Sequence, residues 1–201
     1  MKKNISLFFL FSLLLILIDQ ITKMLVKGFT LFGLSYEGFR YGERVEFLGD
    51  IIQFTFVENP GMAFSIEFGE GKIFLSLFSI IASILLALYI TKIKDKPTGY
   101  IISVLLIFAG ATGNMIDRVF YGVFYDYGPL FYGKVVDFIL VDIPNFEIFG
   151  RYYDYFPVFN IADSCVSVGI VLLLFYNQHI PTLSELRNKN NTSENNEWWK
   201  K

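Results

Sequence analysis

The chain has 201 residues, of which 54% are hydrophobic and 18% charged, whereas soluble domains carry about 25% charged residues. A net charge of −2 without a basic stripe argues against nucleic-acid binding. The single cysteine, Cys165, excludes an intramolecular disulfide, and the single histidine disfavours a zinc centre. The composition therefore favours a membrane protein that does not depend on a metal.

Four uncharged runs approach the length of a bilayer span, for which a helix needs roughly 20 apolar residues. They are Asn4–Ile18, Ile73–Ile90, Pro97–Ile116 and Ser164–Ile180. With their flanks they predict helices over about 4–27, 71–92, 97–120 and 157–179. The expected fold is mainly α, an integral membrane protein with four transmembrane helices.

The first run has an alternative interpretation, because Lys2 and Lys3 before an apolar stretch are also typical of a cleavable signal peptide. Such a signal ends in small residues with an Ala-x-Ala pattern. This run instead ends in Asp19-Gln20-Ile21-Thr22-Lys23. The sequence therefore favours a helix that is retained.

Basic residues predict the orientation of the helices, since they concentrate on the cytoplasmic side. Those before, between and after the spans on one side are Lys2, Lys3, Lys92, Lys94, Lys96, Arg187, Lys189, Lys200 and Lys201, whereas the two long segments carry few basic residues for their length. Both termini are therefore expected in the cytoplasm, and segments 28–70 and 121–156 outside. Residues 1–182 form the predicted membrane domain, and 183–201, rich in Asn, Lys and Glu, a disordered cytoplasmic tail.

The outward segments have their own patterns. Val45–Val57 is rich in β-branched and aromatic residues and predicts one or two short strands. Tyr121–Phe131 and Tyr152–Phe159 are rich in Tyr and Phe, which favour the headgroup region. We expect a small extracytoplasmic β-sheet on the membrane surface, and interpret Val135–Leu140 as an apolar loop segment that dips into the interface.

Four aspartates converge on the outer side in this topology: Asp19, Asp117, Asp137 and Asp163. A charged side chain at the centre of a membrane helix costs about 2.5–3.5 kcal/mol on insertion scales, which makes a functional role the default. The alternative is hydrogen bonding between helices, worth roughly 0.6 kcal/mol per contact. Four such acids on one side of the membrane favour function.

Several pairs are spaced three or four residues apart and so share a helix face: Asn114 with Asp117, Asn160 with Asp163, and Asp19 with Lys23. Arg118 can neutralise a carboxylate nearby. We expect two carboxylates to share a proton while Lys and Arg hold the others ionised. Such a pair supplies an acid and a base together, as attack of water on an amide requires.

Other chemistries fit less well. His179 follows Cys165 by 14 residues, about 21 Å along a helix, which puts a Cys–His pair out of reach. A Ser65–Lys23 dyad is conceivable, but Asp19 is a simpler partner for Lys23. A transporter or proton relay would place ionisable groups at several depths, and the cytoplasmic halves of the spans lack acids. A membrane chaperone that keeps the fold without activity is a third alternative.

Five stretches together resemble lipoprotein signal peptidases (signal peptidase II), over about Asn4 to Asn177. They are Asp19-Gln20-Ile21-Thr22-Lys23, Asn59-Pro60-Gly61-Met62-Ala63-Phe64-Ser65, Gly113-Asn114-Met115-Ile116-Asp117-Arg118, Val135-Val136-Asp137-Phe138 and Phe159-Asn160-Ile161-Ala162-Asp163-Ser164. Each is weak alone, but all five occur in the family's order. The likeness is therefore specific.

The resemblance implies an aspartic endopeptidase of the bacterial inner membrane, active toward the outer leaflet. Such enzymes cut the signal peptide from prolipoproteins just before the diacylglyceryl-modified Cys, and globomycin inhibits them. The implied catalytic dyad is Asp137 and Asp163. Residues implied to shape the site and hold the substrate are Asp19, Lys23, Asn59, Asn114, Asp117, Arg118 and Asn160. Membrane lipids are implied partners, and no metal or organic cofactor is implied.

Taken without the resemblance, Asp117 and Asp137 both remain candidates to pair with Asp163. Asp117 lies beside Arg118, which fits an ionised structural carboxylate, whereas apolar neighbours should raise the pKa of Asp137. The chain departs from the family at Met62, where a small residue is usual, and in its longer stretches Phe120–Lys134 and Val141–Tyr155. These stretches could line a groove for acyl chains or serve as interfacial padding.

Overall fold

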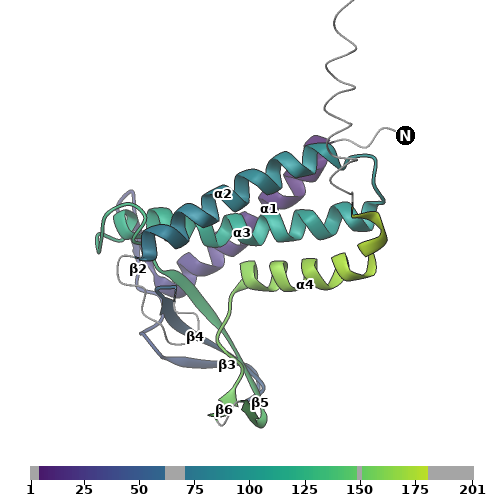
Figure 1. The fold of residues 1–201 in the computed structure, drawn as a ribbon. Coiled ribbons are helices and arrows are strands. Elements are labelled where there is room, and N and C mark those ends of the chain that lie inside the picture. Colours follow the sequence, from purple (N-terminus) through teal and green to yellow (C-terminus); the bar gives the residue numbers. More distant parts are fainter. Residues whose placement is uncertain (1–4, 62–70, 149–150, 181–201) are drawn as a thin grey trace, which may run out of the picture.

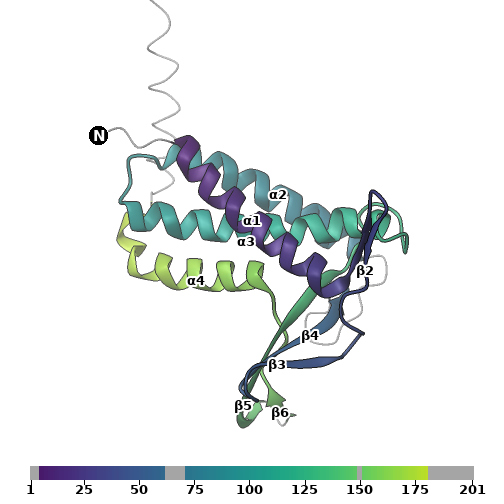
Figure 2. The same cartoon turned by 180° about the vertical axis from the view of Figure 1, so that it is seen from behind.

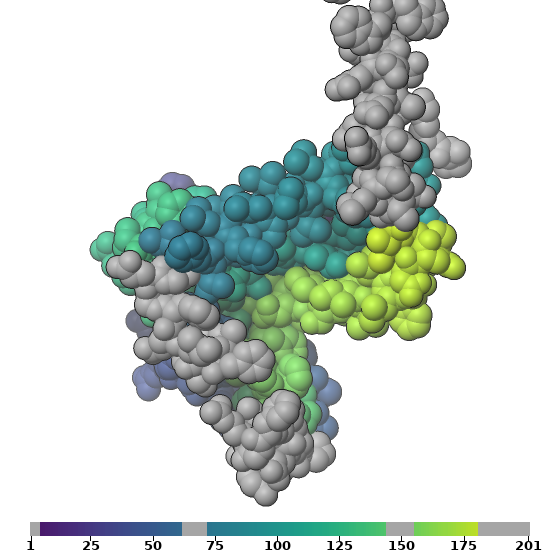
Figure 3. All heavy atoms as spheres, in the orientation of Figure 1, coloured from purple at the N-terminus to yellow at the C-terminus, as the bar shows by residue number. Residues whose placement is uncertain are grey.

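The computed structural model describes residues 5–61, 71–148 and 151–180. Its helices form a bundle (Figure 1), and they are α1 (Ile5–Lys27), α2 (Gly71–Lys92), α3 (Thr98–Phe124) and α4 (Ile161–Phe175), followed by the short 3-10 helix η1 (Asn177–His179). Helix α3 contacts each of the other three, and α1 crosses it in the view from behind (Figure 2). Helices α2 and α4 form much of the opposite face (Figure 3).

The helices have an apolar exterior. Three of them, Ile5–Lys27, Lys72–Lys92 and Thr98–Phe124, are long and apolar enough to cross a membrane, and α4 is apolar but has 15 residues. Large exposed side chains include Leu10, Leu14, Leu17, Ile21, Phe74, Phe78, Ile81, Leu85, Val171, Leu174 and Phe175. Lipid is the solvent that suits such a surface.

Three helix boundaries differ from the prediction. Helix α4 begins at Ile161 rather than near 157, because Asn160 closes a capping box with Asp163 and so fixes the start; it ends at Phe175 rather than near 179. Helix α3 runs to Phe124 rather than to about 120. The predicted outward segment 121–156 therefore begins with helix. The tail 183–201 lies outside the described residues.

In the part of the chain that the structure describes, six strands form two antiparallel sheets. Strands β1 (Phe29–Leu31) and β2 (Leu34–Tyr36) form a hairpin directly after α1. The larger sheet has the order β3-β4-β5-β6, with β3 (Arg44–Leu48), β4 (Ile52–Asn59), β5 (Val135–Ile148) and β6 (Arg151–Tyr155). It extends from the end of the bundle where α1 ends and α4 begins (Figures 1 and 2).

Strands β3 and β4 confirm the prediction for Val45–Val57, but the interpretation of Val135–Leu140 as a loop was wrong. This segment begins β5, which lies between β4 and β6. Val136 is 0% and Phe138 is 4% exposed. A strand that is buried on both faces lacks the alternation of apolar and polar residues and appears in the sequence as a continuous apolar run. Periodicity alone cannot distinguish such a strand from other buried segments.

Two contacts fix the sheet against the bundle. A buried cluster joins Val26 of α1 and Tyr121 of α3 to Val136 and Phe138 of β5. Beside it, Glu58 of β4 accepts hydrogen bonds from Lys27, at the end of α1, and from Lys134, whose Nζ is 2.7 Å away. Burial acts to raise the pKa of Glu58, but the two lysines outweigh it and lower the pKa. The start of β5 is therefore held in a fixed position.

Helices α3 and α4 approach each other closely at the same end of the bundle. A Cβ atom on Gly110 would lie 2.2 Å from the backbone oxygen of Ala162, which no side chain can accommodate without moving one helix. Glycine lets the two backbones meet, as small residues do between membrane helices. The first turn of α4 therefore lies directly against α3.

Candidate active site

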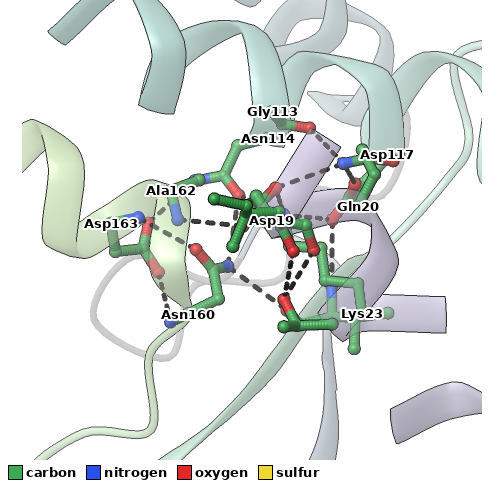
Figure 4. A network of polar contacts seen from close by, with 12 residues as sticks. Asp19, Gln20, Lys23, Gly113, Asn114, Asp117, Asn160, Ala162 and Asp163 are labelled. Carbon is green, nitrogen blue, oxygen red and sulfur yellow. Dashed lines mark hydrogen bonds and ion pairs between the residues drawn. The ribbon is translucent and has the colours of Figure 1, made fainter. Parts of the chain in front are cut away.

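Polar residues gather where α1, α3, β5 and the start of α4 meet (Figure 4). Asp19 and Lys23 come from α1, Asn114 and Asp117 from α3, Asp137 from β5, and Asn160 and Asp163 from the start of α4. Nearly all are buried, although they are polar or charged. Buried polar groups need partners, and the contacts of this cluster show how the chain supplies them.

Lys23 joins two carboxylates. Its Nζ lies 2.8 Å from Asp19 Oδ2 and 2.8 Å from Asp117 Oδ2, and it donates to Asn114 Oδ1 at 2.9 Å. The Lys23 and Asp117 side chains are 0% exposed and that of Asp19 is 2% exposed. These contacts use all three donors of the ammonium. Lys23 is therefore committed to structure, which removes the basis for the Ser65–Lys23 dyad; Ser65 lies outside the described residues.

Asp117 pairs with a different cation from the one the sequence indicated, Lys23 instead of Arg118. Consecutive helix residues point about 100° apart, and Arg118 Nη1 donates instead to the Asn114 backbone oxygen at 3.4 Å. The Asp117 carboxylate also accepts from Val136 N at 3.2 Å and from Gln20 Nε2 at 2.9 Å. With Lys23 these donors occupy both oxygens, so Asp117 fits a structural role.

The first turn of α4 holds Asp163. Its backbone N–H donates to Asn160 Oδ1 at 2.9 Å, and its Oδ2 accepts from the Asn160 N–H at 3.2 Å. Its Oδ1 accepts from Asn114 Nδ2 at 2.7 Å. Carboxylates are stabilised at helix N-termini by the helix dipole. Asp163 is thus oriented from both α3 and its own helix cap.

Asp137 is 4% exposed and lies in β5 opposite Val57 of β4. Its Oδ1 accepts from Asn160 Nδ2 at 2.7 Å, and Asn59 of β4 also hydrogen-bonds to it. Burial raises the pKa of Asp137 to about 7, and repulsion from the Asp163 carboxylate adds to the increase. A carboxyl group that titrates near neutral pH can exchange a proton with a reactant.

Asn160 contacts both acids, so the structure brings Asp137 and Asp163 to the two sides of one side chain. Arg118 lies close enough to Asp117, Asp163 and Asp137 to interact electrostatically with their carboxyl groups. Its Nε is buried and has no hydrogen-bond partner among the described residues. The arrangement is two neighbouring carboxyl groups, one with a raised pKa, beside a guanidinium.

Sequence reasoning did not single out Gln20 or Tyr121. Gln20 Nε2 contacts Asp19 and Asp117, and Tyr121 donates to Gln20 Oε1 at 3.1 Å. The spacing carried a signal, because Tyr121 lies four residues after Asp117 and shares its helix face. Within the described residues, no cluster of three or more His, Cys, Asp or Glu side chains is arranged to hold a metal ion.

Comparison with known proteins gives consistent matches. The family described as Signal peptidase (SPase) II matches residues 11–178. The chain is 37% identical over 180 residues to the lipoprotein signal peptidase of Pelodictyon phaeoclathratiforme, which covers 89% of this chain and 95% of that protein. It is 37% identical over 187 residues to the lipoprotein signal peptidase of Porphyromonas gingivalis, and this match covers 80% of this chain and 78% of that protein.

The fold is also similar to a solved structure, that of a bacterial membrane enzyme determined by the in meso method at 1.9 Å resolution. The TM-score is 0.61 at 30% sequence identity, over 90% of this chain and 97% of that chain. A second structure of a bacterial membrane enzyme by the same method gives a TM-score of 0.60 at 29% identity.

Proposed function

The chain belongs to the signal peptidase II family, and we propose that it cuts diacylglyceryl-modified prolipoproteins just before the lipidated Cys, with Asp137 and Asp163 as an aspartate dyad. Family membership makes it a protease that removes signal peptides from prolipoproteins. The observation that supports the dyad is the shared contact with Asn160 together with the pKa of Asp137, raised to about 7 by burial and by Asp163.

The mechanism follows from two neighbouring carboxyl groups that hold one proton between them. The ionised member takes a proton from water, and the resulting hydroxide attacks the scissile carbonyl carbon. The protonated member hydrogen-bonds the carbonyl oxygen, where negative charge develops. The tetrahedral intermediate then collapses as the C–N bond breaks and the leaving amine takes up a proton from the dyad.

The other polar residues have supporting roles in this proposal. Lys23, Asp19 and Asp117 hold α1 against α3, and Asn114 and Asn160 orient the two acids. Asn59 and Arg118 contact or face the dyad from β4 and α3, where they are suited to hold the substrate backbone. Globomycin is expected to block the site.

We further propose that all four helices span the bacterial inner membrane, with α4 lengthened by its flanking residues. Both termini and the tail 183–201 then lie in the cytoplasm, residues 1–182 form the membrane domain, and the dyad faces the outer leaflet. The sheet, which extends sideways from the same end of the bundle as the dyad (Figure 1), lies on the membrane surface. A lipidated substrate would enter laterally from the lipid.

Mass spectrometry of a diacylglyceryl-modified prolipoprotein incubated with the purified chain in lipid tests the proposal. The wild-type chain should release the signal peptide, and globomycin should prevent this. Asp137→Asn and Asp163→Asn should each abolish cleavage, whereas Asp126→Asn, at an exposed position, should not. Full cleavage by either dyad variant defeats the assignment, and an intact substrate with the wild-type chain would favour the proton-relay or inactive-chaperone alternatives.

A further inference from the structure

The side-chain amide of Gln20 contacts four polar groups, one on α1 and three on α3 (Figure 4). Its Nε2 donates to Asp117 Oδ1 at 2.9 Å and lies 3.2 Å from Asp19 Oδ2 and 3.2 Å from the Gly113 backbone oxygen. Its Oε1 accepts from the hydroxyl of Tyr121 at 3.1 Å. The amide therefore presents its nitrogen to the carboxylates and its oxygen to the tyrosine.

The Gln20 amide supplies a hydrogen-bond donor to the Asp117 oxygen that Lys23 does not contact. Lys23 provides one positive charge for the two carboxylates, Asp19 and Asp117, and contacts Oδ2 of each. Asp117 Oδ1 is left to Gln20. A carboxamide offers donors without charge, whereas a second cation would need a further anion in a site where charges are buried.

The position of Asp117 bears directly on the dyad. Asp117 Oδ2 accepts from the N–H of Val136 at 3.2 Å, and Asn160 Nδ2 donates to the Val136 oxygen at 3.2 Å. Val136 immediately precedes Asp137. The backbone that carries the dyad residue is therefore held from α3 by Asp117 and from the start of α4 by Asn160.

We propose, on the basis of the proposed function, that Gln20 and Tyr121 are positioning residues of the dyad. The Tyr121 hydroxyl orients the Gln20 amide, the amide fixes Asp117, and Asp117 fixes the Val136 peptide and with it the Asp137 carboxyl. Tyr121 is 4% exposed, so solvent does not replace its hydroxyl. The hydrogen-bond chain crosses from α3 to α1 and back before it reaches β5.

Replacement of Gln20 by methionine keeps the side-chain length and removes the amide. In Gln20→Met, Asp117 Oδ1 loses its hydrogen-bond donor. The kcat for cleavage of the diacylglyceryl-modified prolipoprotein should then fall about tenfold or more with little change in KM, because a displaced catalytic group stabilises the transition state less while substrate binding is unaffected. Tyr121→Phe should lower kcat less, by about threefold, because it removes one neutral hydrogen bond.

Gln20→Glu tests the positioning role through the pH dependence of cleavage, which a purely structural role of Gln20 would not change. A protonated Glu side chain can accept from Tyr121 and donate to Asp117, whereas an ionised one repels both neighbouring carboxylates. The titratable groups around position 20 are Asp19 and Lys23 on α1, Asp117, Tyr121 and Tyr125 near the end of α3, and Cys165 on α4 near Asp19. Cleavage by Gln20→Glu should therefore approach the wild-type rate at low pH and fall more steeply than the wild type as pH rises.

The full-length chain in lipid serves for all variants, with Gln53→Met as the matched control, because the half-buried Gln53 of β4 makes an exposed hydrogen bond to the Asp50 backbone oxygen. The control should keep the wild-type rate and pH profile. A Gln20→Met chain with a lower melting temperature but wild-type kcat, or a Gln20→Glu chain with the wild-type pH profile, would overturn the positioning role. A wild-type chain that does not cleave contradicts the proposed function itself.

Discussion

Asn160 donates a 2.7 Å hydrogen bond from Nδ2 to Asp137 Oδ1. The oxygen of the same side chain accepts the backbone N–H of Asp163 at 2.9 Å and caps α4. One residue, which belongs to neither the helix nor the strand, thus links the strand that carries one acid to the helix that carries the other. The relative position of the two carboxyl groups depends on this side chain.

Two substitutions at Asn160 separate capping from the contact with Asp137. Asn160→Ser keeps a capping oxygen but is too short to reach the carboxyl, and Asn160→Ala loses both. Loss of a cap costs about 0.5–2 kcal/mol, so the Ala variant should melt at a lower temperature than the Ser variant. Both should cleave the lipidated substrate about 100-fold more slowly, because the acids are no longer aligned. A Ser variant with wild-type kcat would show that capping alone matters.

The raised pKa of Asp137 predicts how stability changes with pH. The folded state, with a pKa of about 7, holds the proton more tightly than the unfolded state, whose value is near 3.8. The contribution of this proton to stability is complete below the unfolded pKa and is lost as pH rises through the folded pKa. Asp137→Asn is neutral at every pH and can still accept from Asn160.

The Asp137→Asn chain should therefore be more stable than the wild type at pH 8, by a few kcal/mol at most, and the difference should disappear near pH 4. Thermal unfolding in detergent at both pH values measures the effect. Asp126→Asn, at an exposed position, serves as the control and should melt like the wild type at both. Equal melting temperatures of Asp137→Asn and the wild type at pH 8 would contradict a raised pKa of Asp137.

Features encoded locally were predictable from the sequence. The uncharged runs indicated the long helices, and the Asp19–Lys23 spacing indicated an ion pair, which the structure shows at 2.8 Å. The β-branched run in Val45–Val57 indicated one or two strands, and the structure has two, β3 and β4. Each of these depends on residues within about one or two turns of one another, where spacing determines which side chains meet.

Contacts between distant segments were not predictable in this way. The pairing of Lys23 with Asp117 joins helices far apart in the chain, and Arg118, adjacent in sequence, was the nearer candidate. The long strand β5 was missed because its start is apolar on both faces, and its pairing partner β4 lies before α2. The start of α4 follows from the local capping box of Asn160 with Asp163. The contacts of Asn160 with Asn114 and Asp137 join distant segments, and the local sequence does not reveal them.

The buried lysine predicts strong coupling between charges. Lys23→Met leaves Asp19 and Asp117 without their cation, and an uncompensated buried charge costs about 3–5 kcal/mol. The double variant Asp19→Asn/Lys23→Met removes one of the two carboxylates and should recover part of this loss, a non-additivity that thermal unfolding detects. Lys94→Met, at an exposed position, should have no effect. If the double variant is no more stable than Lys23→Met alone, the two residues are not coupled.

The contact between α3 and α4 predicts that two crowded glycines, Gly110 and Gly169, differ in their effect on catalysis. In Gly110→Ala the new Cβ would lie 2.2 Å from the Ala162 backbone oxygen, in the first turn of α4 beside Asp163. In Gly169→Ala it would lie 2.8 Å from the Ser103 backbone oxygen, farther along α4. Overpacking of this kind costs about 1–3 kcal/mol, so both variants should melt at lower temperatures.

Only Gly110→Ala moves the turn that holds Asp163 against Asn114, so its kcat should fall at least about tenfold more than that of Gly169→Ala, because small displacements of a catalytic group are costly. Gly128→Ala is the neutral control, since its nearest neighbour would be Tyr132 Cβ at 3.6 Å, an ordinary contact. Cleavage assays well below the melting temperatures separate the two effects. Equal loss of kcat in Gly110→Ala and Gly169→Ala would mean that general destabilisation, rather than the position of Asp163, limits cleavage.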